Sequence, residues 1–459
     1  MRSPTHTNKN AVIIGAGISG LTAAYLLTSR GYDVKVLEKS ERSGGTIRTE
    51  YFDGYMIEHG PNSTLETTPL IDELLKMLGI LNKKIPANES AKKRYILKNG
   101  KILPLPMSPP SFISSKLFSA KAKLRLFKEP FIKSKSNPSE SIADFTRRRL
   151  GTEFLDYAIN PFVAGVFAGD PENLNVKTAF PKLYELEQKY GSLIGGSLKS
   201  RKERKNRNEE SKQSAKTISF SGGMQQLTDA LFLKLKGRIE FDCAVSGILK
   251  NNGKYTVNYR KNSEDIALES DIVILSVPAY AAAPLISGLD TALSGELSKV
   301  YYPPVNIIYT GFRTKDIKFN LDGFGFLIPG KENRKILGSL WTSVIFPGRA
   351  PEGSYLLTNF TGGSRSPEMA DLNDEENVRI VRDELDSIIG LNNSPVFSKI
   401  IRWEKAIPQY GKNYSAITDM IENFSAVNSG LYICSNFFKG ISVCDCIKNA
   451  FETANKITE

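Results

Sequence analysis

Three glycines and one acid near the start of the chain have a spacing that suits phosphate chemistry. Gly15, Gly17 and Gly20 form a Gly-x-Gly-x-x-Gly turn between a short apolar run and a longer apolar segment. Glu38 ends a second, β-branched run eighteen residues after Gly20. In such a unit the first glycine permits a tight turn, the second lets backbone approach a pyrophosphate, and the third lets helix pack on strand. The pattern therefore predicts a dinucleotide site rather than a phosphate-free unit of the same shape.

The contacts expected at this site follow from the same geometry. A helix N-terminus presents N–H groups and a favourable field to an anion. A carboxylate at the end of the second strand can accept hydrogen bonds from ribose hydroxyls. The residues expected to hold the dinucleotide are Gly15, Ala16, Gly17, Ile18, Ser19, Gly20, Glu38 and Lys39.

A second glycine pair follows the acid directly, which an NAD site would not need. Gly44 and Gly45 precede Thr46 and Arg48 in "SGGTIRTE". This run resembles the second glycine signature of the FAD-dependent amine oxidase and protoporphyrinogen oxidase superfamily. The resemblance implies FAD as the cofactor, with the glycines passing close to it and Arg48 reaching its phosphate or flavin.

Three later segments resemble further cofactor-binding elements of that superfamily. The loop in "EHGPNST" is expected to pass the flavin ring, the "CAVSGIL" strand to contact adenine, and the turn in "CSNFFKGISVCDC" to meet the flavin and pyrophosphate. Cys434-Ser435-Asn436 departs from the Gly-Gly-Asn or Gly-Ala-Ser of many relatives, so which N–H is used there stays open. The residues implied are Gly60, Pro61, Asn62, Ser63, Ala244, Val245, Ser246, Asn436, Gly440, Ile441, Ser442 and Val443.

The middle of the chain carries a more specific resemblance. "RRRLGTEFLDYAINPFVAGVFAGDPENL", with the later "GSLIGG", "GFGFLIP", "NFTGG" and "RWEKAIPQY", is similar to oxygen-dependent protoporphyrinogen oxidases, in the same order and over the chain from residue 11 onward. The resemblance implies a flavoenzyme that removes six electrons from protoporphyrinogen IX, passes them through FAD to dioxygen, and so yields protoporphyrin IX and peroxide.

The same resemblance implies a substrate site. Arg94 matches an arginine that pairs with a propionate, Phe324 an aromatic residue against a pyrrole ring, and Gly165 a backbone contact to the macrocycle. Phe326 replaces Phe324 if the register is shifted by two. Val305 and Ile307 are candidate cavity walls, although a strand core explains them equally well. From the residues alone, Arg94 is an exposed charge at a strand start, and "PFVAGVFAGDP" is a packed turn or a pocket wall.

The resemblance also implies an α/β fold. We expect a discontinuous Rossmann-like FAD-binding domain, a mixed-sheet substrate domain, and a helical, membrane-associated domain. The expected ranges are 1–88, 216–292 and 411–459 for the first, 89–104 and 293–410 for the second, and 105–215 for the third.

Other activities stay in competition. Coproporphyrinogen III is the alternative substrate, an amine oxidase or carotenoid desaturase is the alternative class of enzyme, and an FAD-stabilised scaffold is the non-enzymatic possibility. Only two histidines are present, so a Ser/His/Asp hydrolase is not expected. The four cysteines indicate a reducing compartment, and their spacing indicates no metal site.

Charge and hydropathy bear on the surroundings of the protein. Lys and Arg number 61 against 49 Asp and Glu. Residues 111–136 alternate seven basic residues with apolar ones, which predicts either a membrane-surface segment or an ordinary solvated helical layer. Residues 198–216 are polar and are expected to form an exposed loop without nucleic-acid binding. Two uncharged stretches, 11–29 and 272–289, contain glycines or prolines and are expected to be strand, turn and helix rather than membrane spans.

From these features we expect a location in the cytoplasm or at the cytoplasmic face of the cell membrane, without a signal or transit peptide. The expected partners are the porphyrinogen substrate, dioxygen, a peripheral membrane surface, ferrochelatase or another pathway enzyme, and a second copy in a homodimer.

Overall fold

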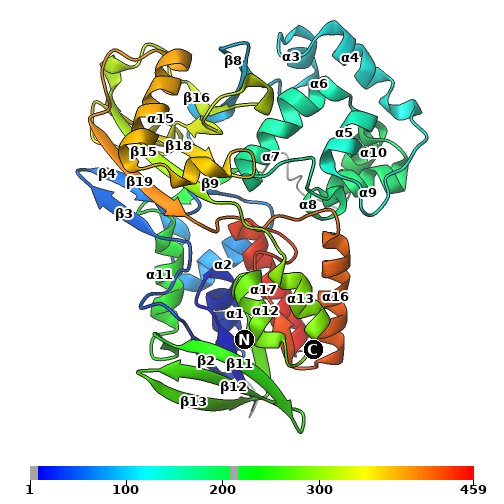
Figure 1. The fold of residues 1–459 in the computed structure, drawn as a ribbon, viewed down its shortest axis with the longest axis vertical. Helices are drawn as coiled ribbons and strands as arrows, with labels where there is room; N and C mark the ends of the chain where they lie inside the picture. Colours follow the sequence, from blue (N-terminus) through cyan, green and yellow to red (C-terminus); the bar gives the residue numbers. More distant parts are fainter. Residues whose placement is uncertain (1–8, 207–214, 459) are drawn as a thin grey trace.

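A five-stranded parallel sheet forms the lower half of the molecule (Figure 1). The computed structural model describes residues 9–206 and 215–458. The strand order is β10-β2-β1-β14-β20. These strands span Asn10–Ile14 (β1), Asp33–Leu37 (β2), Ile239–Glu240 (β10), Ile272–Leu275 (β14) and Leu431–Ile433 (β20). Distant parts of the sequence therefore meet in one sheet, as the discontinuous Rossmann-like arrangement predicts.

Both faces of this sheet are covered, which explains why its strands are apolar throughout. Four helices pack on one face through a shared core: α1 (Ile18–Ser29), α2 (Leu70–Leu78), α11 (Gln225–Lys234) and α17 (Val443–Thr458). The other face is covered by an antiparallel meander of β11 (Ala244–Asn251), β12 (Lys254–Lys261) and β13 (Glu264–Ser270), and by α12 (Ala279–Ile286), α13 (Thr291–Ser298) and α16 (Tyr414–Val427). Both uncharged stretches of the sequence are accordingly strand and helix.

A seven-stranded mixed sheet forms the upper left part of the molecule (Figure 1). Its order is β19-β15-β18-β17-β16-β7-β8. The strands span Lys93–Lys98 (β7), Lys101–Pro104 (β8), Val305–Arg313 (β15), Gly323–Leu327 (β16), Gly338–Leu340 (β17), Ser354–Gly362 (β18) and Phe397–Trp403 (β19). Helix α15 (Asp374–Ile389) packs on one face through a core of its own.

Two small sheets and several short elements connect the large ones. β3 (Thr49–Phe52) pairs with β4 (Tyr55–Glu58), and β9 (Thr217–Phe220) pairs with β5 (Thr64–Leu65) and β6 (Lys84–Pro86). The short helices here are η1 (Leu81–Lys83), η2 (Glu89–Lys92), η5 (Thr314–Asp316), η6 (Gly330–Glu332), α14 (Thr342–Ile345) and η7 (Pro367–Asp371). These short elements connect the parallel sheet, which contains β2, with the mixed sheet, which contains β7.

A helical insert forms the upper right part of the molecule (Figure 1). It contains α3 (Pro109–Ser114), α4 (Ala120–Phe127), η3 (Glu129–Phe131), α5 (Ile142–Arg149), α6 (Thr152–Phe154), η4 (Leu155–Ile159), α7 (Asn160–Phe167), α8 (Val176–Ala179), α9 (Pro181–Tyr190) and α10 (Leu193–Asn206). The expectation of a loop from residue 198 is wrong as far as 206, because α10 continues that far, and residues 207–214 lie outside the described residues. Among the described helices, none has the length and apolarity to cross a bilayer.

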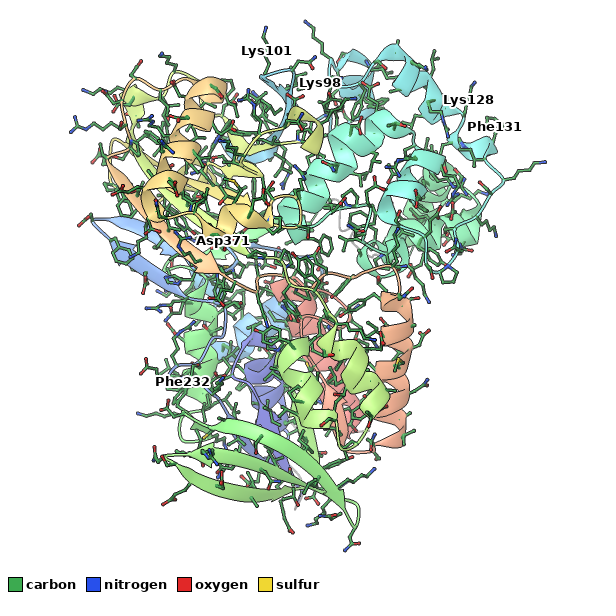
Figure 2. The ribbon with its side chains drawn as sticks, viewed as in Figure 1. Lys98, Lys101, Lys128, Phe131, Phe232 and Asp371 are labelled. Carbon is green, nitrogen blue, oxygen red and sulfur yellow. The ribbon has the colours of Figure 1, made fainter. Side chains whose placement is uncertain are left out.

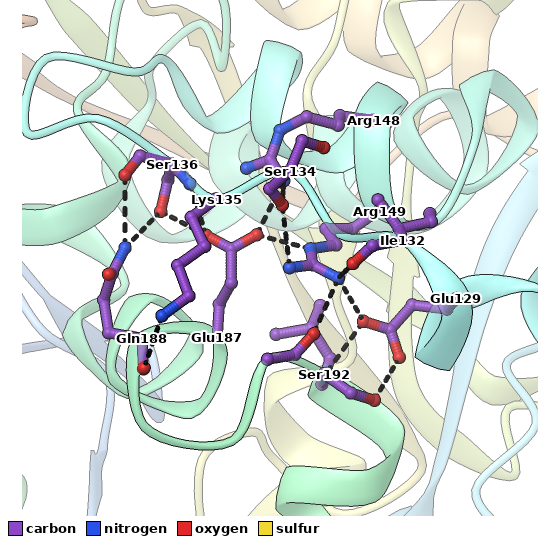
Figure 3. A network of polar contacts seen from close by, with 12 residues as sticks. Glu129, Ile132, Ser134, Lys135, Ser136, Arg148, Arg149, Glu187, Gln188 and Ser192 are labelled. Carbon is purple, nitrogen blue, oxygen red and sulfur yellow. Dashed lines mark hydrogen bonds and ion pairs between the residues drawn. The ribbon is translucent and has the colours of Figure 1, made fainter.

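A buried polar network holds the insert together (Figure 3). The guanidinium of Arg149, with no exposed surface, ion-pairs with Glu129 and Glu187, which are equally buried. Glu129 also accepts hydrogen bonds from the Ser192 hydroxyl at 2.7 Å and the Leu193 N–H at 2.8 Å. The single acid of the basic segment 111–136 is thus an internal anchor, and the outer face of that segment is left basic and apolar.

Candidate functional site

The Gly15–Gly20 turn leads from β1 into α1 and has two glycines that cannot carry a side chain. A Cβ on Gly20 would lie 2.0 Å from the Gly15 carbonyl oxygen, and one on Gly15, whose φ is +103°, would lie 2.8 Å from the Ser276 carbonyl oxygen. Gly17 differs, because a Cβ there would meet no described atom within 4 Å. The turn therefore leaves open space in front of the Gly17 backbone.

The N-terminus of α1 faces this open space. Gly17 is the N-cap residue, no side chain among residues 9–206 and 215–458 caps the helix, and its first turn contains no acidic residue. The Ser276 hydroxyl, beside Gly20, is buried and has no hydrogen-bond partner among the described residues. Free N–H groups and an unpaired hydroxyl at one helix N-terminus fit an anionic group.

Glu38 directly follows β2, at the same carboxyl edge of the parallel sheet as the Gly15–Gly20 turn that follows β1. Its carboxylate accepts hydrogen bonds from the Ala16 N–H at 2.6 Å and from the Ser40 hydroxyl at 2.7 Å. The Cys243 N–H donates to the Glu38 carbonyl oxygen at 2.8 Å, so the expected adenine segment at Ala244 and Val245 begins beside this acid. Lys39 is exposed.

The second glycine pair packs directly on the first turn. Gly44 (φ +102°) donates its N–H to the Ala16 carbonyl oxygen at 2.8 Å, and a Cβ on Gly45 (φ +59°) would lie 3.1 Å from the Gly17 Cα. Arg42, which the sequence did not single out, donates to the carbonyl oxygens of Ser43, Gly45 and Ile47. Burial lowers the pKa of Arg42, and its role is to hold the loop's carbonyl groups in place.

Arg48 pairs with Glu50 in this structure, and Glu50 also contacts the His59 Nε2 at 2.8 Å. Burial would raise the pKa of Glu50, but His59 and Arg48 together hold it below its usual range. The His59 N–H donates to the Arg48 carbonyl oxygen at 2.8 Å, and a Cβ on Gly60 would lie 2.3 Å from the Thr46 carbonyl oxygen. The 58–63 loop is therefore seated against the second glycine segment.

The C-terminal segment completes the same region. Gly440 has a φ of +130°, and its N–H donates to the Tyr410 hydroxyl at 3.2 Å. That hydroxyl donates to the Asn436 carbonyl oxygen at 2.8 Å. The Ser442 hydroxyl accepts the Asp445 N–H at 3.1 Å in the first turn of α17, so the turn that contains Ile441 and Val443 is held at a helix N-terminus.

A second group of expected residues lies on the mixed sheet. The Arg94 guanidinium lies over the Phe324 ring, 4.4 Å from its centroid. Arg94 forms no ion pair within the described part of the chain, whereas Lys93 pairs with Asp322 and Lys92 with Glu89. Arg94 is exposed at the start of β7, as the strand-start alternative predicts, although the protein atoms around its guanidinium displace water and lower its pKa. Strand alternation puts Arg94 on the face of β7 shared with Ile96, toward the helical insert.

Gly165 belongs to a helix rather than to a turn, because residues Asn160–Phe167 form α7. A Cβ on Gly165 would lie 2.7 Å from the Leu327 Cδ2 of β16, so the glycine lets α7 approach the mixed sheet. Phe162 and Val166 are 45% and 39% exposed, and Gly165 is exposed between them on one face of the helix. This face of α7 thus combines close packing on β16 at Gly165 with exposed side chains at Phe162 and Val166.

These elements match a known family. The model of the family described as "Flavin containing amine oxidoreductase" matches residues 18–458 of the chain. The chain belongs to this family. The protein is therefore a flavoprotein with FAD as its cofactor, and the turns around Gly17, Gly45, Gly60 and Gly440 are the elements that would hold it.

Full-length relatives within this family are of two named kinds. The mitochondrial protoporphyrinogen oxidase of Nicotiana tabacum is 32% identical, with 98% of this chain and 94% of the relative covered. The coproporphyrinogen III oxidase of Bacillus subtilis is 30% identical, with 96% of each chain covered. A candidate protoporphyrinogen oxidase from Exiguobacterium sp. 255-15 has the same fold, with a TM-score of 0.79 at 21% identity over 98% of this chain and 99% of that one.

Some of the residues expected to line the substrate site do not face open space. Val305 is 6% exposed and lies in a core with Ala164 and Leu337, and Ile307 is 4% exposed in a core with Tyr309 and Ile401. Their side chains thus pack inside the protein, as the strand-core alternative has it. Phe326 is likewise a core residue, at 1% exposure, whereas Phe324 is partly buried and packs against Ala91, Ile345 and Phe346.

Proposed function

We propose that this protein oxidises protoporphyrinogen IX to protoporphyrin IX, with dioxygen as the final acceptor and peroxide as the second product. The single observation that carries the proposal is Arg94, a cation that has no ion pair with any residue the structure describes and that is stacked on Phe324. An arginine fork suits a carboxylate, and an adjacent aromatic ring suits a pyrrole. The names of the full-length relatives support this choice of substrate class.

The chain itself has to bind and orient the substrate rather than supply a strong base. Bound FAD supplies the acceptor for hydride, which is the redox chemistry of the reaction. Arg94 binds a propionate, Phe324 stacks against the macrocycle, and the exposed face of α7 gives Gly165 a backbone contact with it. Pyrrole nitrogens lose their protons as conjugation develops, so the low number of histidines is no obstacle.

Coproporphyrinogen III is the second candidate, because a relative of nearly equal identity carries that name. This substrate has four carboxylates where protoporphyrinogen IX has two. The neighbours of Arg94 at positions 92 and 93 are already paired with acids, so the region offers few free cations. Fewer free cations favour the substrate with fewer carboxylates.

The test is a direct comparison of both porphyrinogens with the purified holoenzyme. We expect kcat/KM to be at least about tenfold higher for protoporphyrinogen IX, the size of one charge-assisted contact. A preference for coproporphyrinogen III would overturn the choice of substrate. Oxidation of neither, with FAD bound, would overturn the activity and favour an amine oxidase, a desaturase or an FAD-stabilised scaffold.

We also propose that the protein attaches peripherally to an anionic membrane through the helical insert. The attachment surface consists of Met107, Ile113, Leu124, Phe127 and Phe131 with Lys121, Lys128 and Lys133, all exposed. Figure 2 shows Lys128 and Phe131 at the outer edge of the insert. Lysines beside exposed aromatic side chains suit the boundary between headgroups and acyl chains.

A homodimer and transfer of product to ferrochelatase or another pathway enzyme are further parts of this proposal.

A further inference from the structure

A buried ion pair lies under the loop that is seated against the second glycine segment. The carboxylate of Glu58 and the guanidinium of Arg349 are 2.9 Å apart, with 2% and 1% of their side chains exposed. Glu58 also accepts the Met224 N–H at 2.9 Å and the Thr49 hydroxyl at 2.7 Å. Arg349 also donates to the Ser219 hydroxyl at 2.6 Å. The pair is therefore fully hydrogen-bonded, and it joins β3, β4, β9 and the start of α11.

One hydroxyl connects this cluster to the mixed sheet. Tyr309, a fully buried residue of β15, donates its O–H to the Glu58 carbonyl oxygen at 2.6 Å and accepts the Glu58 N–H at 3.0 Å. The same oxygen lies 3.3 Å from the Asn62 Oδ1. Burial raises the pKa of Tyr309, so the hydroxyl keeps its proton and remains a donor. One side chain of the mixed sheet thus hydrogen-bonds both backbone groups of Glu58, at the start of the 58–63 loop, and lies against Asn62 near the end of the loop.

The 58–63 loop that Tyr309 contacts is also held by hydrogen bonds from Ser219 and Trp403, and it lies beside the elements expected to bind the cofactor. The Ser219 hydroxyl, a partner of Arg349, donates to the Asn62 carbonyl oxygen at 3.3 Å. The Trp403 Nε1 of β19 donates to the His59 carbonyl oxygen at 2.6 Å. Gly60, between His59 and Asn62, packs on the carbonyl oxygen of Thr46, and Gly45, the residue before Thr46, packs on Gly17. A shift of a few tenths of an ångström here would therefore change the polar environment of the bound cofactor.

We propose that Tyr309 is a positioning residue through which the mixed sheet sets the 58–63 loop against FAD and so tunes the reactivity of the flavin. The inference depends on FAD binding alone and holds for any substrate. It also assigns a task to the Glu58–Arg349 pair, which keeps the strand before the loop in one register. Removing either partner would leave a buried charge, so Tyr309 is the cleaner residue to change.

The test compares Tyr309→Phe with Tyr255→Phe in the FAD-loaded protein. Tyr255 of β12 is the control, because its side chain is equally buried and its hydroxyl donates to the carbonyl oxygen of Ser429, between α16 and β20, at 2.8 Å. We expect both variants to lose similar thermal stability. Only Tyr309→Phe should change the visible circular dichroism of the flavin and its midpoint potential. The affinity of the flavin for sulphite should change by roughly tenfold in this variant, because one hydrogen bond is lost.

Flavin signals that are the same in Tyr309→Phe, Tyr255→Phe and the parent protein would overturn the proposal. If Tyr309→Phe does not fold, Trp403→Phe removes the other hydrogen bond from the mixed sheet to the same loop and is expected to shift the same flavin signals. Unchanged signals in that variant would equally overturn it. Neither readout requires turnover of a porphyrinogen, so a failure of this inference is distinct from a failure of the proposed function.

Discussion

At the residue scale, the three glycines of the first turn lack a side chain for different reasons. Gly15 and Gly20 would bring a Cβ into backbone oxygens at 2.8 and 2.0 Å, so the folded chain itself requires them. Gly17 has no such neighbour, and a Cβ there would point into open space. We therefore expect a requirement for glycine at position 17 to come from the bound cofactor and not from the folded chain.

Gly17→Ala is expected to weaken FAD retention by roughly ten- to a hundredfold, because the added methyl group occupies space that the pyrophosphate needs. The apoprotein should lose only about 1 kcal/mol, the cost of a poorer helix N-cap. Dialysis with flavin fluorescence measures the retention. Gly288→Ala is the control, since a Cβ on this exposed glycine after α12 also meets no described atom within 4 Å. Equal FAD retention in both variants would contradict the prediction.

Arg94→Ala is expected to raise the KM for the porphyrinogen about ten- to a hundredfold through loss of a charge-assisted contact. FAD content should stay unchanged, because Arg94 lies on β7, away from the glycine turns. Steady-state kinetics and flavin absorbance measure the two effects. Lys92→Ala removes a neighbouring cation that already pairs with Glu89 and serves as the control. Loss of FAD, or an unaltered KM, would show that Arg94 has another role.

Residues with a local signature could be found from the sequence, and residues that act through distant contacts could not. Gly15, Gly17, Gly20 and Glu38 are fixed by their spacing, since a turn and two adjacent strands determine their positions. Arg349 and Tyr309 meet Glu58 only because β15 and the chain after α14 fold onto β4. The two residues lie more than two hundred positions from Glu58, so no short pattern relates them to it.

At the element scale, the helical insert depends on Glu187 of α9. Its carboxylate is paired with Arg148 and Arg149 and accepts the Ser136 N–H at 2.7 Å (Figure 3). Burial alone would raise the pKa of Glu187, but the two arginines and Ser136 lower it from 4.5 to about 2. A depressed pKa means that the charged form stabilises the fold.

Glu187→Gln is therefore expected to destabilise the protein by about 3 kcal/mol at neutral pH. The stability from Glu187 is fully present above pH 4.5 and is lost as the pH falls toward about 2. The difference in unfolding free energy between parent and variant should accordingly narrow over that window, as denaturant titrations at several pH values can measure. Glu185→Gln, an exposed position of the same helix, should show little effect at any pH. A difference that is constant with pH would refute the role of this carboxylate.

The insert also shows why its elements were harder to predict than those of the parallel sheet. The segment "PFVAGVFAGDP" contains two glycines, which favoured a turn, yet it forms α7 and ends at Ala168 in the left-handed region. Contacts with Leu327 and with Gln409, whose Nε2 donates to the Phe167 carbonyl oxygen at 2.8 Å, stabilise that helix. Tertiary packing thus outweighed a weak local propensity.

At the scale of the whole molecule, the helical insert combines positive charge with exposed apolar side chains. The net charge is +12, and exposed lysines of the insert lie beside exposed apolar side chains. Phe131 is 82% exposed, although a phenylalanine of a soluble surface is normally covered. An anionic bilayer would cover it and neutralise the lysines at the same time.

Replacing Lys121, Lys128 and Phe131 by Ser is expected to reduce co-sedimentation with anionic vesicles at low salt by roughly tenfold or more. Each lysine near such a surface contributes about 1 kcal/mol. Val427→Ser, a 77% exposed apolar position at the end of α16, is the control. Co-sedimentation that survives the triple replacement would place the attachment elsewhere.

The route of the chain through the parallel sheet has a consequence for biosynthesis. Of the five strands β1 is made before the others, β14 follows about 260 residues later, and β20, an edge strand, is made last. The last helix, α17, then packs on α1, where Arg30 contacts Asn455 at 2.6 Å. Until α17 has been made, the side of α1 that α17 covers has no partner and the segment around Gly440 is absent from the glycine turns. We therefore expect the nascent chain to expose apolar surface until late in folding, and a variant that lacks α17 to retain FAD poorly.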